Sequence, residues 1–279
     1  LRRFANRLMC KRLIAFLLKT KPDVVIATQF LASEIVSYVK RAHGANIKLI
    51  TVVTDFGVHN FWLAPETDTY CCASEATRQI LLKKGVAESS IKITGIPLDQ
   101  KFLNVGKKED CVADFHIKHD KFSALIITGG IGAGPIEEIV ALLKDEMQLL
   151  VVCGNNKALY QKLKNKNYEN VRLFGFVDFV QKLMKVSDCI ITKAGGLTIT
   201  ESLASGKPMV FFFLIPGQEE INARMMEGLQ AGIIAPTPEK IAQVVLNFKN
   251  NRTELAAFSQ RALSLAKPHS ASEIVALIG

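Results

Sequence analysis

Short runs of consecutive apolar residues recur along the whole chain, separated by longer stretches in which apolar residues return at helical spacing. The short runs are rich in Val, Ile, Leu, Phe and Cys. Runs of this kind are typical of strands that are covered on both faces, and therefore of parallel sheets. We expect strands over residues 23–28, 48–54, 69–73, 91–94, 123–128, 148–153, 170–174, 188–192 and 208–213.

The stretches between these runs predict helices over residues 31–42, 75–84, 136–146, 157–165, 179–186, 197–204, 219–230 and 239–249. Alternating strands and helices predict an α/β protein with doubly wound, Rossmann-like sheets. A polar, charged stretch at 106–110 indicates a boundary between two domains, residues 1–104 and 105–279, with a final helix over 252–278 able to return to the first domain. The first domain shows too few strands for a whole Rossmann sheet, so we expect the N-terminal domain to be incomplete in this sequence.

The composition is that of a folded protein with reduced cysteines. Apolar residues make up 49% of the 279 residues and charged residues 22%, unlike the composition of disordered chains. No apolar run approaches the roughly 18 residues needed to cross a bilayer. The six cysteines show no Cys-x-x-Cys spacing, which favours thiols in a cytosol over a disulfide framework or a zinc site.

The net charge of +9 is unevenly placed, because residues 1–21 contain Arg and Lys but neither Asp nor Glu. Leu, Ile and Phe lie between these cations at helical spacing, which predicts a basic amphipathic helix. Such a helix meets either an anionic membrane surface or the rest of an α/β domain, and the sequence leaves both open. Nucleic acid is the less favoured partner, because no basic patch is interleaved with stacking aromatic residues.

A glycine-rich turn joins the expected strand at 188–192 to the expected helix at 197–204. Gly195 and Gly196 leave room for a ligand beside the backbone, and the helix N-terminus behind them carries about half a positive charge. The turn, Gly195 to Thr198, therefore suits a phosphate or diphosphate, although a plain strand-to-helix turn fits the same residues. Glu201 follows one turn into the helix, where its carboxylate can accept hydrogen bonds from a ribose diol.

Glycine or small polar residues also follow the neighbouring strands of the second domain. In open parallel sheets ligands bind beyond the carboxyl ends of the strands, so these residues predict one nucleotide-diphosphate site. The donor-site candidates are Gly130, Asn155, Phe176, Val177, Gly195, Gly196, Leu197, Thr198, Glu201, Gln218, Glu219 and Asn222.

The last three of these candidates allow two interpretations. Gln218 and Asn222 lie four residues apart on the first turn of an expected helix, where amide and carboxylate groups suit the vicinal hydroxyls of a sugar. Glu219 and Glu220 also favour a helix N-terminus electrostatically, without any ligand. That second interpretation does not account for Gln218 and Asn222.

In the first domain, one loop after the strand at 48–54 brings together Asp55, His59 and Trp62. Asp55 or His59 can act as an acid or base or contact a substrate, although a single His is more often structural. No His-Glu-x-x-His, EF-hand, Gly-x-Ser-x-Gly or Walker-type phosphate-loop pattern occurs. An Asp-x-Asp pair is absent as well, so we expect neither a metal–diphosphate site nor a cofactor.

The chain resembles the monogalactosyldiacylglycerol synthase and processive diacylglycerol glucosyltransferase family, from about residue 22 to about residue 235. This family has the GT-B fold, two Rossmann-like domains that face a cleft, and is related to the lipid II-forming N-acetylglucosaminyltransferase. The motifs that carry the resemblance are Thr54-Asp55-Phe56, Thr94-Gly95-Ile96-Pro97, Gly129-Gly130, Cys153-Gly154-Asn155-Asn156, Gly175-Phe176-Val177, Thr192 to Glu201 and Pro216-Gly217-Gln218-Glu219 with Asn222.

The resemblance implies inverting transfer of a hexose from UDP-glucose or UDP-galactose to diacylglycerol or a glycosyl-diacylglycerol, on the cytoplasmic face of the membrane. By resemblance, the turn at Gly195 holds the diphosphate, Glu201 the ribose, and the backbone at Phe176 reads the uracil. Gln218, Glu219 and Asn222 face the diphosphate and the donor sugar, and the cleft of the first domain takes Asp55, His59 and Trp62.

Two departures from the family pattern limit the assignment. The family's expected catalytic base is a His in a segment that this sequence lacks, so no catalytic residue is assigned. Asn155 stands where relatives usually carry Arg. The alternatives are a lipid II-type transferase of UDP-N-acetylglucosamine, a UDP-sugar epimerase of similar fold, and an inactive UDP-binding fragment.

Overall fold

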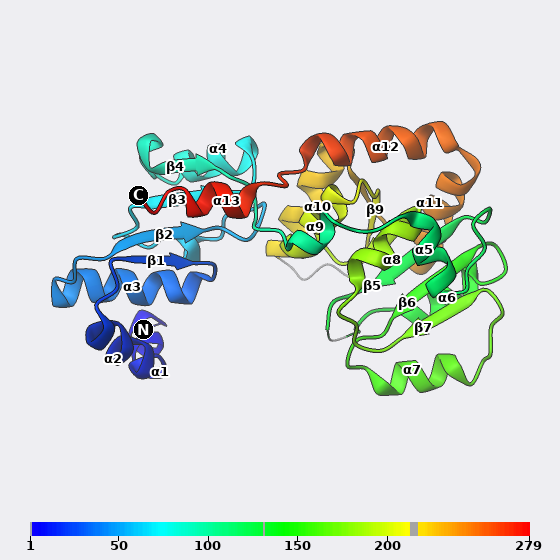
Figure 1. Ribbon diagram of the computed structural model, residues 1–279, viewed down its shortest axis with the longest axis horizontal. Helices are drawn as coiled ribbons and strands as arrows, with labels where there is room; N and C mark the ends of the chain where they lie inside the picture. Colours follow the sequence, from blue (N-terminus) through cyan, green and yellow to red (C-terminus); the bar gives the residue numbers. More distant parts are fainter. Residues whose placement is uncertain (1, 131, 213–216) are drawn as a thin grey trace. The chain divides into compact units, whose positions relative to one another are not determined.

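The computed structural model describes residues 2–130, 132–212 and 217–279, and the chain divides into two compact units (Figure 1). Unit 1 comprises residues 1–97 and 267–279, and unit 2 comprises residues 98–266. The sequence analysis placed the division after residue 104, and it allowed the final helix to join the first domain.

Unit 1 is built on a parallel sheet in the order β1-β2-β3-β4. The strands are β1 (Val24–Ala27), β2 (Lys48–Val52), β3 (Thr69–Cys72) and β4 (Ile91–Ile93). Its helices are α1 (Arg2–Met9), α2 (Lys11–Thr20), α3 (Phe30–His43), α4 (Glu75–Lys83) and α13 (Ser270–Val275).

Alternate residues of β2 reach the two faces of this sheet, because successive side chains of a strand point in opposite directions. Leu49 packs with Val36 and Val39 of α3 on one face. Ile50 and its neighbours pack with Ile274 of α13 on the other. The C-terminal end of the chain therefore covers one face of the sheet of unit 1.

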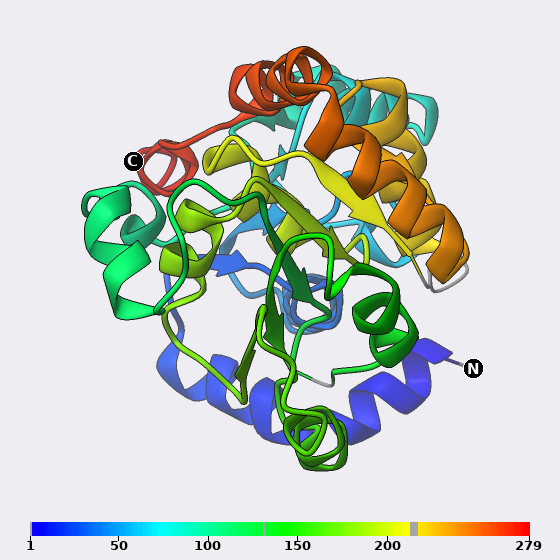
Figure 2. The ribbon, with the colours of Figure 1, turned by 90° about the vertical axis from the view of Figure 1, so that its right-hand side faces the viewer.

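Unit 2 is a parallel sheet in the order β10-β9-β8-β5-β6-β7. The strands are β5 (Ser123–Ile127), β6 (Gln148–Val152), β7 (Val171–Phe174), β8 (Cys189–Thr192), β9 (Met209–Phe211) and β10 (Gly232–Ile234). The helices are α5 (Lys108–Asp114), α6 (Ile136–Leu143), α7 (Lys157–Lys164), α8 (Val180–Val186), α9 (Gly196–Ala204), α10 (Gln218–Gly228), α11 (Pro238–Asn250) and α12 (Arg252–Leu265). Figures 1 and 2 place α7 and α12 at opposite ends of this unit.

The strand order of unit 2 reverses between β5 and β8. From β5 the chain builds outward through β6 and β7, and it then returns to the other side of β5 with β8 and β9. Helices cover both faces, with α6 and α11 packing over one core and α5 and α8 over the other. Ligands of doubly wound sheets bind at the carboxyl edge beside such a reversal. The loops that follow β5 and β8 therefore flank the expected binding position.

Differences from the expected elements have local causes. The expected helix over 252–278 is interrupted, since α12 ends at Leu265 and α13 starts at Ser270, and Pro268 between them cannot continue a helix. The single basic helix expected at the N-terminus is likewise interrupted at Cys10, which separates α1 from α2. No helix among the described residues is long and apolar enough to cross a bilayer.

Candidate functional site

The turn between β8 and α9 has the predicted strand–turn–helix form, with Gly195 at the N-cap of the helix. The first intrahelical bond runs from the Ile199 N–H to the Gly195 carbonyl at 3.0 Å, so the N–H groups of the three residues before Ile199 have no partner within the helix. No side chain of the residues that the structure describes caps them. The φ of Gly195 is −74°, and a Cβ there would meet no atom within 4 Å. Neither backbone conformation nor packing requires glycine at this position, which leaves space for an anion.

The loops after β5 and β6 pack tightly against each other. The Asn155 N–H donates to the Gly130 carbonyl at 2.9 Å. A Cβ on Gly154 would lie 2.7 Å from that same carbonyl oxygen, and one on Gly132 would overlap the Cys153 carbonyl. Gly154 and Gly132 have φ values of +58° and +63°, which favour glycine. Glycine is therefore needed at both positions for the packing of the two loops, whether or not a ligand binds. Gly130 and Asn155, both predicted donor residues, are exposed beside each other.

An ion pair joins the loop after β8 to α10. The Lys193 ammonium lies 2.9 Å from the Glu219 carboxylate, whose side chain is 12% exposed. The same lysine side chain passes 3.7 Å from where a Cβ of Gly129 would be. The loops after β5 and β8 and the first turn of α10 therefore meet around Lys193. The sequence analysis did not include Lys193 among the site residues, although it stands directly between the strand and the glycine turn.

Asn222 and Gln218, both predicted donor-site residues, differ in exposure. Asn222 is fully buried, and its side-chain amide donates to the Ala194 carbonyl at 3.0 Å. This hydrogen bond ties α10 to the glycine turn, and a contact of Asn222 with the sugar stays a prediction. Gln218 starts α10 and is half-buried. Pro216, which the sequence analysis grouped with these residues, lies outside the described residues.

Glu201 is a half-buried carboxylate one turn into α9. Burial raises its pKa from the ordinary 4.5 to about 7, against the opposing charge of Lys101, while Asp99 raises the pKa further. Among the described residues, no hydrogen bond within the protein reaches this carboxylate. An acceptor that is held in a partly desolvated position without a donor of its own is suited to hydroxyl groups of a ligand.

The loop after β7 presents an aromatic side chain to solvent. Phe176 is 71% exposed, whereas Val177 packs partly against the core beneath. Leu197, at the first turn of α9, is 56% exposed. An exposed aromatic ring such as that of Phe176 offers a planar ligand a surface on which to stack.

The three candidates of unit 1 have different environments. Trp62 is 2% exposed and packs edge-on against Phe30, with ring centroids 6.0 Å apart, so it is a core residue. His59 is exposed, and its Nδ1 accepts a hydrogen bond from the Phe61 N–H at 3.2 Å, which caps a short 3₁₀ turn. Asp55 is 8% exposed. Trp62 and His59 both have structural roles in this loop.

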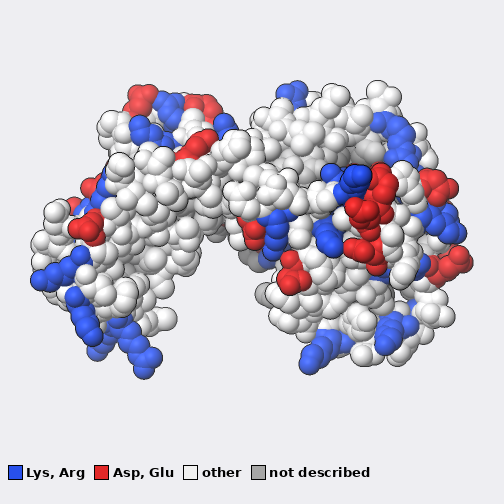
Figure 3. All heavy atoms as spheres, viewed as in Figure 1, with Lys and Arg blue, Asp and Glu red and all other residues white. Residues whose placement is uncertain are grey.

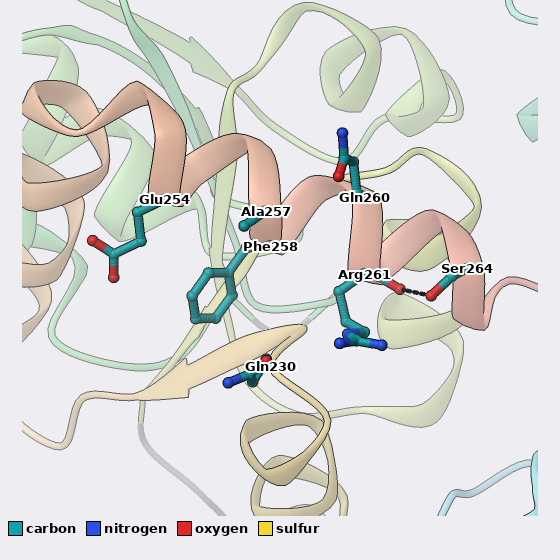
Figure 4. Close-up of a pocket in the computed structure, with 7 residues that line it drawn as sticks. All are labelled: Gln230, Glu254, Ala257, Phe258, Gln260, Arg261 and Ser264. Carbon is teal, nitrogen blue, oxygen red and sulfur yellow. Dashed lines mark hydrogen bonds between the residues drawn. The ribbon is translucent and has the colours of Figure 1, made fainter.

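A groove of about 620 Å³ lies along α12 in unit 2, next to Gln230 (Figure 4). Its side chains include Glu254, Phe258 and Arg261. Gln230 precedes β10, so this groove is at the amino end of that strand. Nucleotide ligands of such sheets bind at the opposite, carboxyl edge, and the groove is therefore separate from the candidate site.

Two parallel sheets, a strand reversal flanked by glycine loops and an uncapped helix N-terminus are features of the GT-B fold, and the family matches make the protein a glycosyltransferase. Residues 2–98 match the monogalactosyldiacylglycerol synthase family, and residues 124–274 match the C-terminal domain of glycosyltransferase family 28. Together with the relatives described next, these matches show that the chain belongs to the monogalactosyldiacylglycerol synthase and processive diacylglycerol glucosyltransferase family, which confirms the resemblance found in its sequence.

The relatives include the processive diacylglycerol beta-glucosyltransferase of Staphylococcus aureus MRSA252. It is 32% identical over 279 residues, which cover 96% of this chain and 71% of the relative. The protein of the same description from strain JH9 is 34% identical over 251 residues, covering 88% of this chain and 63% of the relative. The chain thus spans about two thirds of the length of these relatives.

Solved structures of lower identity share the fold. Acinetobacter baumannii MurG aligns with a TM-score of 0.68 at 20% identity, covering 95% of this chain and 75% of that chain. The UDP complex of S. aureus MnaA aligns with a TM-score of 0.73 at 14% identity, covering 97% of this chain and 79% of that chain. At these identities the similarity concerns the fold alone.

Proposed function

We propose that the protein transfers a hexosyl group, with inversion, from a UDP-sugar to the hydroxyl of diacylglycerol or of a glycosyl-diacylglycerol. The observation that carries the proposal is the uncapped N-terminus of α9 behind Gly195, at the strand reversal of unit 2. The description of the staphylococcal relatives supports the lipid acceptor and favours UDP-glucose over UDP-galactose as donor.

Each part of the donor has a matching group. The diphosphate would accept hydrogen bonds from the free N–H groups of Gly196, Leu197 and Thr198, where the helix dipole favours negative charge. Glu201 would accept hydrogen bonds from the ribose hydroxyls. The loop at Phe176 would hold the uracil.

The hexose would lie near the first turn of α10. Gln218 is half-buried at the start of this helix, and Glu219 lies beside it in contact with Lys193. A carboxylate and an amide can together bind several vicinal hydroxyl groups. Asn222 would contribute indirectly, through its hydrogen bond to the Ala194 carbonyl in the glycine turn.

In the transfer step, the acceptor oxygen forms a bond to the anomeric carbon while the bond from that carbon to the β-phosphate oxygen breaks. The acceptor proton passes to a base to which no residue of this chain is assigned. Negative charge develops on the departing UDP, and the N-terminus of α9 together with the Lys193 ammonium is positioned to stabilise it. We therefore propose that these groups stabilise the negative charge of the leaving diphosphate without a resident metal or cofactor.

The N-terminal helices would bring the protein to an anionic membrane surface, as a peripheral protein of the cytoplasmic face. Leu8, Met9, Phe16 and Leu18 are 48%, 79%, 59% and 37% exposed. Lys11, Arg12 and Lys19 are exposed on the same pair of helices. Figure 3 shows cationic groups gathered over this part of unit 1. Exposed apolar side chains that alternate with cations are typical of helices that lie in the headgroup region.

The proposal is tested in two stages with the purified protein. Calorimetric titration with UDP, with ADP as control nucleotide, tests the donor site. Incubation with diacylglycerol in anionic vesicles and labelled UDP-glucose, UDP-galactose or UDP-N-acetylglucosamine, followed by lipid chromatography, tests transfer. Glycosylated diacylglycerol supports the proposal. Lipid labelling only from UDP-N-acetylglucosamine would favour the lipid II-type transferase instead, and epimerisation of the sugar nucleotide without a lipid product would favour the epimerase. Absence of UDP binding would refute the donor site.

A further inference from the structure

A short 3₁₀ turn, η3 (Gln100–Phe102), stands at the start of unit 2 and precedes the sheet of that unit. Leu98 and Phe102 anchor it, since both are less than 9% exposed and belong to the core cluster under β5 and β8. The Asp99 carboxylate caps the turn by accepting from the Lys101 N–H at 2.9 Å. The position of Lys101 relative to the sheet of unit 2 is therefore fixed by packing on both sides of it.

The Lys101 side chain connects two parts of the candidate donor site. Its ammonium donates to the Asp178 carbonyl at 3.2 Å, in the loop after β7 that carries Phe176. It also lies 3.5 Å from the Asp99 carboxylate. Glu201 of α9 lies within the electrostatic reach of both Lys101 and Asp99. One cation thus contacts the loop assigned to the base, and its charge acts on the carboxylate assigned to the ribose.

We propose that Lys101 is a positioning residue of the nucleotide site, which holds the loop after β7 through the Asp178 carbonyl and supports Glu201 as the acceptor of hydrogen bonds from the ribose hydroxyls. The inference rests on the proposed function, because it presupposes that Glu201 binds the ribose of a nucleoside diphosphate. On this inference, the segment that precedes the sheet of unit 2 takes part in recognition of the donor nucleotide.

The charges around Glu201 predict the direction in which each substitution shifts the pH dependence of UDP binding. Burial raises the pKa of Glu201 to about 7, Lys101 opposes this rise, and Asp99 adds to it. The ionised carboxylate offers an acceptor oxygen to each ribose hydroxyl, whereas protonation turns one of these oxygens into a donor, so UDP binding should weaken as the pH falls through 7. Removing Lys101 should move the midpoint of this loss to higher pH. Removing the charge of Asp99 should move it to lower pH.

The experiment measures UDP affinity from about pH 6 to pH 8.5 for the wild-type protein and four variants. Lys101→Met removes the charge, and Lys101→Arg retains it. Asp99→Asn keeps a capping oxygen without the charge. Lys166→Met, which removes an exposed cation at the end of α7, is the matched control.

Lys101→Met should weaken UDP binding about two- to five-fold near pH 7, the scale of one screened charge interaction, and should shift the midpoint upward. Lys101→Arg should restore the wild-type profile, and Asp99→Asn should shift the midpoint downward. The effect of Lys101→Met should be smaller for 2′-deoxy-UDP, because this ligand makes one fewer bond to Glu201.

The outcomes separate this inference from the proposed function. If the wild-type protein does not bind UDP, the proposed function itself fails. If it binds UDP but Lys101→Met behaves like Lys166→Met, or if the Lys101 and Asp99 variants shift the midpoint in the same direction, the role of Lys101 is overturned while the donor site stands. Equal losses for UDP and 2′-deoxy-UDP would also overturn it.

Discussion

The ammonium of Lys193 and the carboxylate of Glu219 form an ion pair of 2.9 Å between residues that lie 26 positions apart in the chain. The pair joins the glycine turn after β8 to the first turn of α10. The Lys193 ammonium thus lies at the carboxyl edge of the sheet, in the loop that leads into the uncapped N-terminus of α9.

Replacing Lys193 by Met should weaken UDP binding by about 1.5–3 kcal/mol, the typical value of a hydrogen bond to a charged group. The reason is that this ammonium, with the end of α9, would meet the phosphate charge. Calorimetric titration of the folded variant measures the change, and Lys164→Met on the exposed surface of α7 is the control. An affinity equal to that of the control would show that Lys193 serves the protein fold alone.

Two glycine substitutions should separate ligand binding from folding. Gly195→Ala should change the free energy of unfolding by less than about 1 kcal/mol, since its φ is negative and its surroundings are open, yet it should abolish most UDP binding. Gly132→Ala should lower stability by more than about 1 kcal/mol, because its φ is +63° and the new Cβ would overlap the Cys153 carbonyl. Thermal unfolding and UDP titration of both variants test the pair. Full UDP affinity in Gly195→Ala would contradict the diphosphate assignment.

Glu201→Gln should make the protein more stable at alkaline pH while weakening UDP binding. The folded-state pKa of Glu201 is about 7 against 4.5 ordinarily, so the folded protein binds more protons than the unfolded chain between these values. The ionised carboxylate therefore destabilises the protein as the pH rises to 7, by up to roughly 3 kcal/mol, and the penalty vanishes below about pH 4.5.

The variant should then unfold at a higher temperature than the wild type at about pH 8 and at the same temperature near pH 4.5. Its affinity for UDP at about pH 8 should fall by about 1.5–3 kcal/mol. Calorimetry of unfolding and of binding gives both quantities. A stability difference that does not change with pH would contradict the assigned pKa shift.

Phe176→Ala should weaken UDP binding by about 1–3 kcal/mol, the range found when an aromatic platform for a base is removed. Because this side chain is 71% exposed, stability should hardly change. The measurement is UDP titration beside thermal unfolding, with Leu142→Ala, an exposed residue of α6, as control. Undiminished UDP affinity would exclude stacking of the uracil on the Phe176 ring.

Phe16→Ser should reduce binding to anionic vesicles by about 1–2 kcal/mol, because the exposed ring would no longer enter the headgroup region. Co-sedimentation with vesicles at low and high salt measures the partition coefficient. Leu142→Ser in unit 2 is the control, with a side chain that is 44% exposed in the wild type. If both variants bind equally, α2 is a surface helix without contact to lipid.

Much of the fold could be predicted because buried parallel strands are continuous apolar runs. The run at 188–192 corresponds to β8, Cys189–Thr192, and the helix expected from 197 corresponds to α9. The strand β10, Gly232–Ile234, was missed, because three residues that begin with glycine give almost no pattern. The family resemblance, carried by the glycine turns and their order, is confirmed by the match to the synthase family.

The sequence by itself determined the alternation of strands and helices, the glycine turn before α9 and the family, since these depend on residues that are neighbours along the chain. Only the tertiary structure decided the strand reversal between β5 and β8 and the pairing of Lys193 with Glu219. It also decided that Asn222 is buried, with its side chain donating to the Ala194 carbonyl in the glycine turn. It also brought Lys101 close enough for its charge to lower the pKa of Glu201 against the effect of burial. Burial and charge pairing depend on contacts between distant segments, and a local pattern of residue types carries no information about them.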